Sequence, residues 1–355
     1  MIDGADPDAV RRALRANEPL SGADGFAGEL DGRLVRDVLG RYPLFSETDD
    51  PANWSFDPTD LADPDPVPAG HARTESGDER VFALPTPEPI VDEDRAVSAV
   101  RRAVTGAVDA VEGAPPIAFS GGLDSSVLAA RLDGPLYVGG FEGSHDREAA
   151  RSAAGRLDRE LRVVEFTHAD IERAVPAIVE ATGRSNPMDV QIALSLYLVA
   201  EAVSADGYDR LAVGQGADEL FGGYAKVAKA PRDDRVDAST VRGATREVVD
   251  TLPEQLERDV LTLRAAGVEP IAPMLSDRVV EAALSLPGSL LVDGDERKVA
   301  LRRAAAFLPE EIRTRDKKAL QYGSLLSREF DRLARQAGFK HRMDDHLGQY
   351  IESLY

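Results

Sequence analysis

Residues 117–128 of this chain read Ile117-Ala118-Phe119-Ser120-Gly121-Gly122-Leu123-Asp124-Ser125-Ser126-Val127-Leu128. The first three are apolar without alternation, which is typical of a central parallel strand covered on both faces. The two glycines permit a sharp turn and a close approach of the backbone to a ligand. Hydroxyl groups, and the N–H groups that open the next helix, can then hold phosphate. The stretch therefore predicts a strand, a tight turn and a helix that together bind a phosphate group.

An acidic residue inside this turn indicates which kind of phosphate site it forms. A bare Ser-Gly-Gly is a weak signal, with a plain glycine-rich turn as the alternative, and no lysine follows the glycines as in a Walker A loop. Asp124 would repel phosphate unless a divalent cation lay between them. The run Ser-Gly-Gly-Leu-Asp-Ser-Ser resembles the PP-loop of ATP pyrophosphatases, which cleave ATP between the α and β phosphates. This resemblance implies that the chain binds ATP and Mg²⁺.

Composition limits the classes of protein to which the chain can belong. Its 355 residues are 43% hydrophobic, which is enough for one large or two moderate domains. The absence of cysteine excludes disulfides, thiolate metal sites and a thiol nucleophile. A net charge of −21, dispersed along the chain, favours a protein adapted to high salt over an ordinary acidic protein. The same charge disfavours unaided binding to nucleic acid.

The sequence gives no sign of a membrane segment. We find no run of about 18 apolar residues, and the N-terminus has neither a basic region nor an apolar core. A cytoplasmic location is therefore the default expectation, and we expect no membrane partner.

Two regions of the sequence differ in the secondary structure that their residue patterns predict. Residues 1–90 predict a small, β-rich unit with a hairpin turning at Asp31-Gly32, followed by a proline-rich linker at 85–89. Residues 91–355 predict a second domain that begins with a helix; one continuous domain with a β appendage is the alternative. Expected strands and helices alternate up to Val213, which predicts an α/β fold: a parallel sheet with helices on both faces. The expected strands are 136–139, 161–166 and 210–213, and the expected helices are 146–157, 171–180 and 190–203.

The part after Tyr224 predicts mostly helix. Residues 225–242 are charged and predict a mobile loop. The expected helices beyond it are 252–266, 277–286, 297–307 and 327–337.

A second glycine-rich turn follows the strand that ends at Val213. It runs Gly214-Gln215-Gly216-Ala217-Asp218-Glu219-Leu220-Phe221-Gly222-Gly223-Tyr224. In an α/β sheet both turns fall at the carboxyl ends of strands, where ligands bind. Asp124 and Asp218 then predict a Mg²⁺ site. In the alternative interpretation, Asp218 and Glu219 only cap and charge a helix N-terminus.

The two turns together resemble the synthetase domain of the asparagine synthetase family, which includes β-lactam synthetase. Segments 258–277, 298–302 and 313–323 resemble later parts of the same domain, so that the likeness covers about residues 92–330. It implies a PP-loop fold of the adenine nucleotide α-hydrolase type, with a helical C-terminal part.

The family resemblance implies a role for individual residues. Lys317 matches the lysine that stabilises charge on the α-phosphate, a role that suits a compact cation, with an ordinary surface lysine as the alternative. Asp124 and Asp218 would ligate Mg²⁺. Pyrophosphate would be held by Ser120, Gly121, Gly122, Asp124, Ser125 and Ser126. Adenine and ribose would be lined by Ala118, Val138, Gly139, Val213 and Gly214.

Two positions depart from the family pattern. Gln215 stands where asparagine synthetases usually have a glutamate, and glutamine cannot take a proton. Residues 25–45 resemble the later part of the family's glutaminase domain, but Ile2 occupies the second position and no cysteine exists. Thioester chemistry on glutamine is therefore excluded for this chain. The segment predicts a truncated glutaminase-like unit kept for packing or for docking a partner.

Other polar residues are weaker candidates. Asp146 follows the second expected strand, and we interpret it as a helix cap rather than a nucleotide contact. Asn186 and Asp189 precede a buried helix and are candidates to face the acyl substrate. The five histidines lack the spacing of metal ligands.

The sequence thus predicts an ATP-dependent ligase that adenylates a carboxylate, with aspartate as the leading case, and then transfers ammonia or an amine. Gln215, Asp124, Asp218 and Lys317 are the candidate catalytic residues. A PP-loop enzyme acting on tRNA and a non-catalytic nucleotide-binding interaction protein are the alternatives. The identity of the carboxylate, a separate glutaminase subunit and a homodimer stay open.

Overall fold

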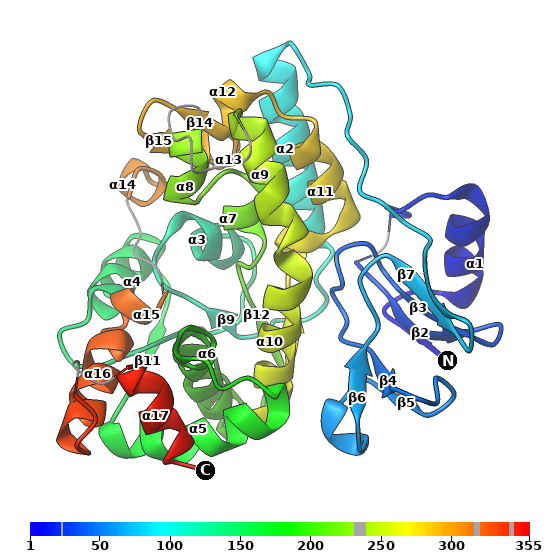
Figure 1. Cartoon of the computed structure of the whole chain (residues 1–355). Helices are drawn as coiled ribbons and strands as arrows, with labels where there is room; N and C mark the ends of the chain where they lie inside the picture. The colour runs from blue at the N-terminus through cyan, green and yellow to red at the C-terminus, as the bar shows by residue number, and fades with distance from the viewer. Residues whose placement is uncertain (23, 231–238, 316–319, 341–343) are drawn as a thin grey trace. The chain divides into compact units, whose positions relative to one another are not determined.

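The computed structural model describes the whole chain except residues 23, 231–238, 316–319 and 341–343 (Figure 1). Contacts between Cα atoms divide the chain into two compact units, each built from three segments. The first unit comprises 1–111, 214–257 and 272–307, and the second comprises 112–213, 258–271 and 308–355. The expected boundary at residue 90 lies inside the first unit, and the domain division at that point stays a prediction.

The second unit contains a five-stranded sheet whose strands are all parallel. Its order is β11-β10-β9-β12-β13, so that the strand before the first glycine-rich turn is central. The strands are β9 (Ile117–Ala118), β10 (Leu136–Gly140), β11 (Leu161–Glu165), β12 (Arg210–Ala212) and β13 (Glu269–Ile271). The expected parallel sheet is therefore confirmed, whereas β13 lies in a part of the chain that we expected to be helical.

The strand order places helices on opposite faces of this sheet. The chain moves from β9 outward to β11 and then returns past β9 to β12, and right-handed crossovers in opposite directions lie on opposite faces. Both α4 and α6 pack against β10, and Tyr137 and Val138 of that strand are buried. The helices between strands are α3 (Leu123–Ala129), α4 (His145–Arg156), α5 (His168–Thr182) and α6 (Pro187–Ala205).

Helix α6 is the one described helix that is long and apolar enough to cross a membrane. More than half of its most apolar stretch is buried inside the protein, and it packs against α5, β10 and β11. These contacts are those of a core helix.

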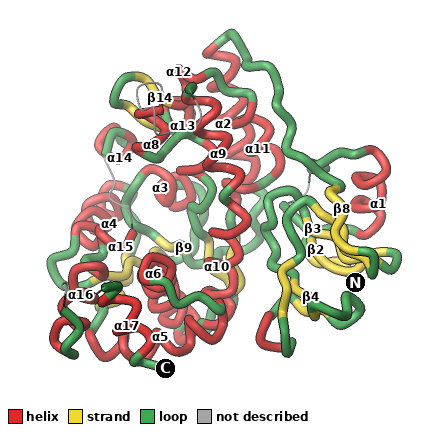
Figure 2. The backbone as a smooth tube through the Cα atoms, viewed as in Figure 1, coloured by secondary structure: helices red, strands yellow, loops and turns green. Residues whose placement is uncertain are grey.

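The C-terminal part of the second unit is helical, as expected (Figure 2). Its helices are α14 (Glu310–Arg313), α15 (Leu320–Gly323), α16 (Leu326–Gln336) and α17 (His346–Glu352). Helix α14 contacts α3, and α15 contacts α4 and α6. The late segments of the chain therefore lie against the helices that follow β9 and β10.

The β-rich part of the first unit consists of two sheets. The first has the order β1-β2-β3-β7-β8 and the second β5-β4-β6. Asp31 and Gly32 both have positive φ between β2 and β3, which confirms the hairpin. The strands are β1 (Ile2–Asp3), β2 (Ala27–Leu30), β3 (Arg33–Arg36), β4 (Phe45–Glu47), β5 (Trp54–Ser55), β6 (Pro64–Pro66), β7 (His71–Thr74) and β8 (Gly77–Arg80). Helix α1 (Pro7–Ala16) and the 3₁₀ helix η1 (Pro58–Asp60) complete this part.

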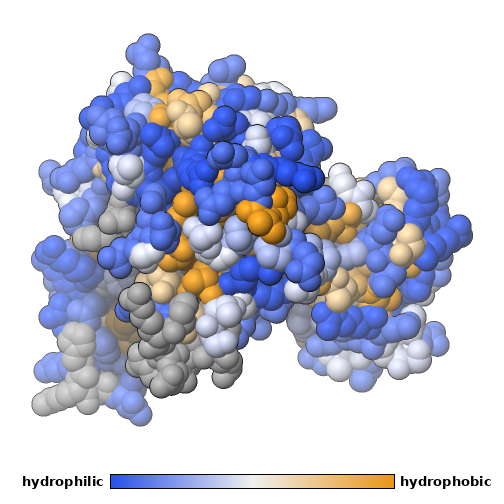
Figure 3. Space-filling model, turned by 90° about the horizontal axis from the view of Figure 1, so that it is seen from above, coloured by the Kyte–Doolittle hydropathy of each residue, from blue (hydrophilic) through white to orange (hydrophobic). Residues whose placement is uncertain are grey.

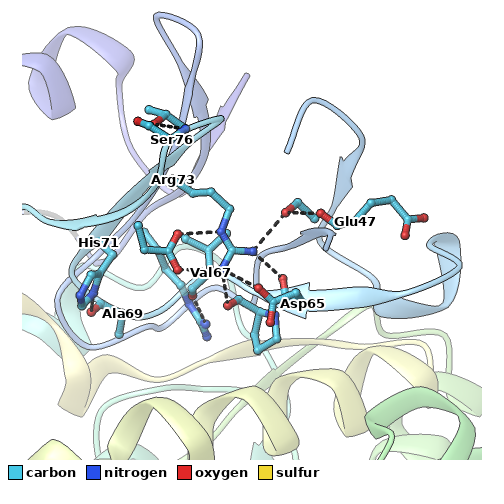
Figure 4. Close-up of polar contacts among 12 residues, drawn as sticks. Glu47, Asp65, Val67, Ala69, His71, Arg73 and Ser76 are labelled. Carbon is cyan, nitrogen blue, oxygen red and sulfur yellow. Dashed lines mark hydrogen bonds and ion pairs between the residues drawn. The ribbon is translucent and has the colours of Figure 1, made fainter. Parts of the chain in front are cut away.

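Arg73 joins these two sheets (Figure 4). From β7 its guanidinium reaches Asp78 beside it at 2.7 Å, and Asp65 of β6 and Ser46 of β4 at 2.8 and 3.1 Å. The side chain is only 8% exposed. A buried cation bonded on several sides fixes the position of one sheet on the other.

The remaining elements of the first unit are mainly helices. They are α2 (Glu93–Asp109), α7 (Ala217–Leu220), α8 (Ala225–Lys229), α9 (Val241–Asp250), α10 (Leu252–Ala265, shared with the second unit), η3 (Pro273–Leu275), α11 (Asp277–Leu284), α12 (Gly288–Leu291) and α13 (Val299–Ala304). Helix α9, and a hairpin of β14 (Val292–Asp293) and β15 (Glu296–Arg297), were not expected. The expected mobile loop at 225–242 begins and ends in helix, and its residues 231–238 lie outside the described part of the chain.

Candidate functional site

The order of the sheet indicates where a ligand would bind. Strands β9 and β12 are neighbours, but the chain leaves β9 toward β10 and reaches β12 only later. In open α/β sheets, ligands bind beyond the carboxyl ends of the strands at such a reversal. The structure brings one group of sequence-predicted residues to the carboxyl-terminal parts of β9, β10 and β12 and the turn after β9: Ala118, Ser120, Gly121, Gly122, Asp124, Ser125, Ser126, Val138, Gly139 and Val213.

The turn after β9 requires glycine at position 121. Its φ is +70°, and a Cβ atom there would lie 2.5 Å from the carbonyl oxygen of Ala149 in α4. Gly122 is the N-cap residue of α3 and provides no side-chain cap to the first N–H groups of that helix. The backbone thus lies directly against α4, and the opening turn of α3 is left for another acceptor.

Polar side chains are buried inside this turn. Asp124 and Ser125 are each 5% exposed and Ser126 is fully buried. The Ser126 hydroxyl has no hydrogen-bond partner among the described residues. The hydroxyl oxygens of Ser120 and Ser125 lie 3.5 Å apart. Buried polar groups usually have partners, and a ligand that accepts hydrogen bonds would supply one here.

The segment after β10 shows that the expected helix cap at Asp146 is wrong. Ser144, not Asp146, is the N-cap residue of α4, and Asp146 lies in the first helical turn at 6% exposure. A Cβ atom at Gly323 would lie 2.2 Å from an oxygen of the Asp146 carboxylate. The amide of Phe141 also donates to the carbonyl of Ser324 at 3.1 Å. Asp146 therefore packs against the late segment instead of capping its helix.

The second glycine-rich turn lies in the first unit, where Asp218 forms an ion pair. The Lys298 Nζ lies 2.7 Å from an Asp218 carboxylate oxygen, and the lysine side chain is only 9% exposed. A Cβ atom at Gly223 would lie 1.9 Å from the same oxygen, so the turn folds back tightly on Asp218. Gly216, not an acid, is the N-cap residue of α7. Asp218 therefore does not cap α7, but Asp218 and Glu219 do lie in its first turn, so the alternative that they charge a helix N-terminus stays open.

Glu219 is buried beside this pair. The hydroxyl of Tyr224 donates to its carboxylate at 2.6 Å. Burial raises the pKa of Glu219 above its ordinary value, an effect that the Tyr224 hydrogen bond opposes and the charge of Asp218 adds to. From the sequence, Lys298 was assigned no role and Glu219 only the alternative of capping or charging a helix N-terminus, although both belong to segments that resemble the family.

The predicted catalytic residues are distributed over the two units. Asp124 belongs to the second unit, and Gln215 and Asp218 belong to the first. Lys317 lies outside the described residues. Within the described residues, no group of three or more histidine or acidic side chains is arranged to hold a metal. The Mg²⁺ ligands and the phosphate-stabilising lysine therefore stay predictions.

Asn186 and Asp189 have partners within the protein. Asn186 caps α6 by accepting from the Asp189 amide at 3.0 Å, and Arg258 donates to the Asp189 carboxylate at 2.7 Å. Both residues thus have structural roles, which disfavours the hypothesis that they face the acyl substrate. The described histidines with carboxylate partners, His168 and His346, pair with Glu329 and Asp331 in α16.

Comparison with known proteins gives one consistent result. The model of the asparagine synthase family matches residues 99–247 and 228–348, which is more than half of the chain. A protein of Methanocaldococcus jannaschii, named as a putative glutamine-hydrolyzing asparagine synthetase, is 32% identical over 269 residues. That alignment covers 65% of this chain and 50% of the relative.

More distant relatives carry similar names. The glutamine-hydrolyzing asparagine synthetase B of Escherichia coli is 24% identical over 229 residues, covering 58% of this chain and 41% of the relative. The glutamine-hydrolyzing asparagine synthetase of Rattus norvegicus is 29% identical over 227 residues, covering 58% and 39%. The alignments thus span half or less of the length of these curated relatives.

Proposed function

Because the chain belongs to the asparagine synthase family, we propose that it is an ATP-dependent ligase that forms an amide. The observation that carries the proposal is the turn after β9, where a backbone conformation that requires glycine is combined with buried Ser125 and Ser126 at a strand-order reversal. These are the features of a site that holds phosphate.

The reaction has two steps. A carboxylate oxygen of the substrate attacks the α-phosphorus of ATP, the bond to the bridging oxygen breaks, and pyrophosphate leaves. The nitrogen of ammonia or an amine then attacks the acyl carbon, the bond to AMP breaks, and the nitrogen loses a proton. We propose aspartate as the leading carboxylate and asparagine as the product.

The proposed roles of the residues follow their chemistry. The turn from Ser120 to Ser126, of the PP-loop type, would hold the departing pyrophosphate. Asp124 and Asp218 provide the carboxylate oxygens that Mg²⁺ prefers, and the ion would neutralise charge on the phosphates. Lys317 would stabilise the charge that develops on the α-phosphate.

Gln215 can orient a substrate but cannot act as a base. The nitrogen therefore arrives unprotonated or loses its proton to another group. Since this chain has no cysteine, ammonia, a substrate amine or a separate glutaminase subunit would supply it.

Pyrophosphate release tests the proposal. It would be measured with ATP and Mg²⁺ in high salt, across a panel of carboxylates, with and without ammonia. We expect release with aspartate, matched by formation of asparagine and lost in Asp124→Ala and Lys317→Ala. Release with another carboxylate alone would keep the adenylation and reject the substrate. ATP binding without any release would instead favour the non-catalytic alternative, which Gln215 supports.

A further inference from the structure

Arg315 makes three contacts with the parts of the second unit that surround the turn after β9. Its Nη1 donates to the carbonyl oxygens of Gly121 at 3.2 Å and of Ala149 at 2.8 Å. Its Nη2 lies 3.3 Å from the hydroxyl oxygen of Ser152. One guanidinium thus bonds both to the turn and to α4, across 194 residues of sequence from Gly121.

The contact with Gly121 falls at the tightest point of the turn. The same residue has its φ of +70° and lies so close to Ala149 that a Cβ atom would be 2.5 Å from the Ala149 oxygen. Two carbonyl oxygens that face one region repel each other unless a donor lies between them. Arg315 supplies that donor, and its planar guanidinium can serve both oxygens at once.

The segment that carries Arg315 is itself anchored. It follows α14, whose Ile312 is fully buried, and α14 contacts α3. The guanidinium therefore approaches the turn from a fixed point of the same unit. A side chain held in this way sets the direction of the Gly121 peptide.

We propose that Arg315 is a positioning residue that holds the turn after β9 in the shape that binds ATP. Its hydrogen bond orients the Gly121 carbonyl toward α4, so that this oxygen points away from the phosphates of bound ATP. The proposal rests on the proposed function for the identity of the ligand, but the ordering of the turn is a property of the ligand-free protein.

Hydrogen–deuterium exchange of the ligand-free protein tests the ordering of the turn by itself. In Arg315→Ala we expect faster exchange of the amides of residues 119–128 than in the wild type, because the turn loses its link to α4. Arg156→Ala is the matched control. Arg156 of α4 pairs with Glu311 of α14 at 2.9 Å between exposed side chains, so the variant removes an α4–α14 contact that does not touch the turn. Unchanged exchange in Arg315→Ala, or equal acceleration in both variants, would overturn the inference.

Binding and turnover then test the consequence for ATP. In Arg315→Ala we expect the Kd of α,β-methylene ATP to rise about tenfold, since a charge-assisted hydrogen bond that orders the site is lost. We expect kcat/KM for pyrophosphate release to fall about 100-fold, the loss typical of a slightly misplaced site. Added guanidinium ion at millimolar concentration should restore part of this loss in Arg315→Ala and none in Arg156→Ala.

The outcomes separate this inference from the proposed function. A wild-type protein that releases no pyrophosphate would count against the ligase, while the exchange experiment would still decide whether Arg315 orders the turn. If Arg315→Ala is less stable, loses ATP binding and gains nothing from guanidinium, its role is general folding and the inference is wrong. Arg315→Lys is a second variant for the case of poor folding, since lysine keeps the charge but has one nitrogen, which cannot replace both the Nη1 contacts with the carbonyls and the Nη2 contact with Ser152. In Arg315→Lys the amides of residues 119–128 should exchange faster than in the wild type, but by a smaller factor than in Arg315→Ala.

Discussion

Gly121 is the residue at which backbone conformation and packing both exclude a side chain. In Gly121→Ala we expect loss of ATP binding and a lower free energy of unfolding, because the Cβ atom would collide with the Ala149 carbonyl at 2.5 Å. Gly143→Ala is a matched control: Gly143 has φ +72° but no atom within 4 Å of its added Cβ, so the variant bears the conformational cost alone, about 1–2 kcal/mol. Urea denaturation and ATP titration compare the two variants. Equal effects on both measurements would show that the collision is unimportant.

Lys298 forms an ion pair with Asp218. Its ammonium lies 2.7 Å from the carboxylate, and its φ of +58° is unusual for a residue with a side chain. In Lys298→Met the apolar stem stays and the positive charge leaves. We expect Mn²⁺, as a probe for Mg²⁺, to bind about tenfold more tightly, because a competing cation is gone. Calorimetry in the absence of ATP measures this, and Asp218→Asn should bind the ion more weakly than the wild type. Weaker binding in Lys298→Met would contradict the expectation.

Asp189 gives the second unit a dependence on pH. Burial raises the pKa of its carboxyl, but hydrogen bonds from Asn186 and Arg258, together with the positive charges of Arg258 and Arg184, outweigh burial and hold the pKa below its ordinary value. Since the folded pKa is lowered, the stabilisation is present above the ordinary pKa of about 4 and is lost as the pH falls through the folded value. We expect the difference in urea midpoint between the wild type and Asp189→Asn to be largest near pH 6 and to shrink toward pH 3. A difference that does not change with pH would show that the charge of Asp189 contributes nothing.

Sequence alone identified the residues of the turn but not the residues that hold it. The pattern from Ser120 to Ser126 is local, so its strand, turn and helix could be predicted. Arg315 contacts Gly121 across 194 residues, and Lys298 meets Asp218 across 80. Periodicity within one segment contains no information about such pairs, and neither residue was assigned a role from the sequence, although both lie in segments that resemble the family.

At the scale of elements, the strands that were predicted are those with a clear local pattern, and the strand that was missed depends on pairing with a distant segment. β10 and β11 are each five residues long and pair along their whole length, and their sequence is largely apolar. β13 has three residues, one of which is Pro270. Proline cannot donate to a ladder and is tolerated at a sheet edge, which is where β13 lies. The Glu269-Pro270-Ile271 pattern therefore did not predict a strand, although the segment forms one by pairing with β12.

Arg41 joins the β-rich part of the first unit to its helical part. Its guanidinium bonds to Asp37 at 2.9 Å, to Asp277 of α11 at 2.8 Å and to the Leu275 carbonyl of η3 at 2.8 Å, and all three side chains are buried. These contacts support a packing role for the segment 25–45, one of the two roles expected for it.

In Arg41→Met we expect a loss of about 3–5 kcal/mol in the free energy of unfolding, because two buried carboxylates lose their cation. The measurement is urea denaturation in high salt. Arg11→Met is the control, since Arg11 pairs with Asp8 and Asp31 at exposed positions, and we expect little change there. A loss in Arg41→Met no larger than that of the control would mean that the β-rich part is held by other contacts.

At the scale of the whole molecule, net charge becomes the dominant property. The face in Figure 3 is mostly hydrophilic, with smaller hydrophobic areas between. The chain contains 63 acidic and 42 basic residues, so that 21 negative charges have no basic counterpart. Many arginines pair with acids at the surface, and salt weakens such pairs, but it also screens the repulsion among the excess charges.

We expect the repulsion to outweigh the pairs, because isolated exposed pairs contribute little and the excess acts over the whole surface. Raising NaCl from 0.1 to 1 M shortens the screening length from about 10 to about 3 Å. The urea midpoint should therefore rise with NaCl, and most of the rise should come below about 1 M, where the screening length changes most. Urea is the required denaturant, since guanidinium chloride is itself a salt. An uncharged solute at equal osmolarity is the control, because screening requires ions whereas exclusion from the surface does not. A midpoint that falls in NaCl would show that surface ion pairs, not charge repulsion, dominate the electrostatic stability of this protein.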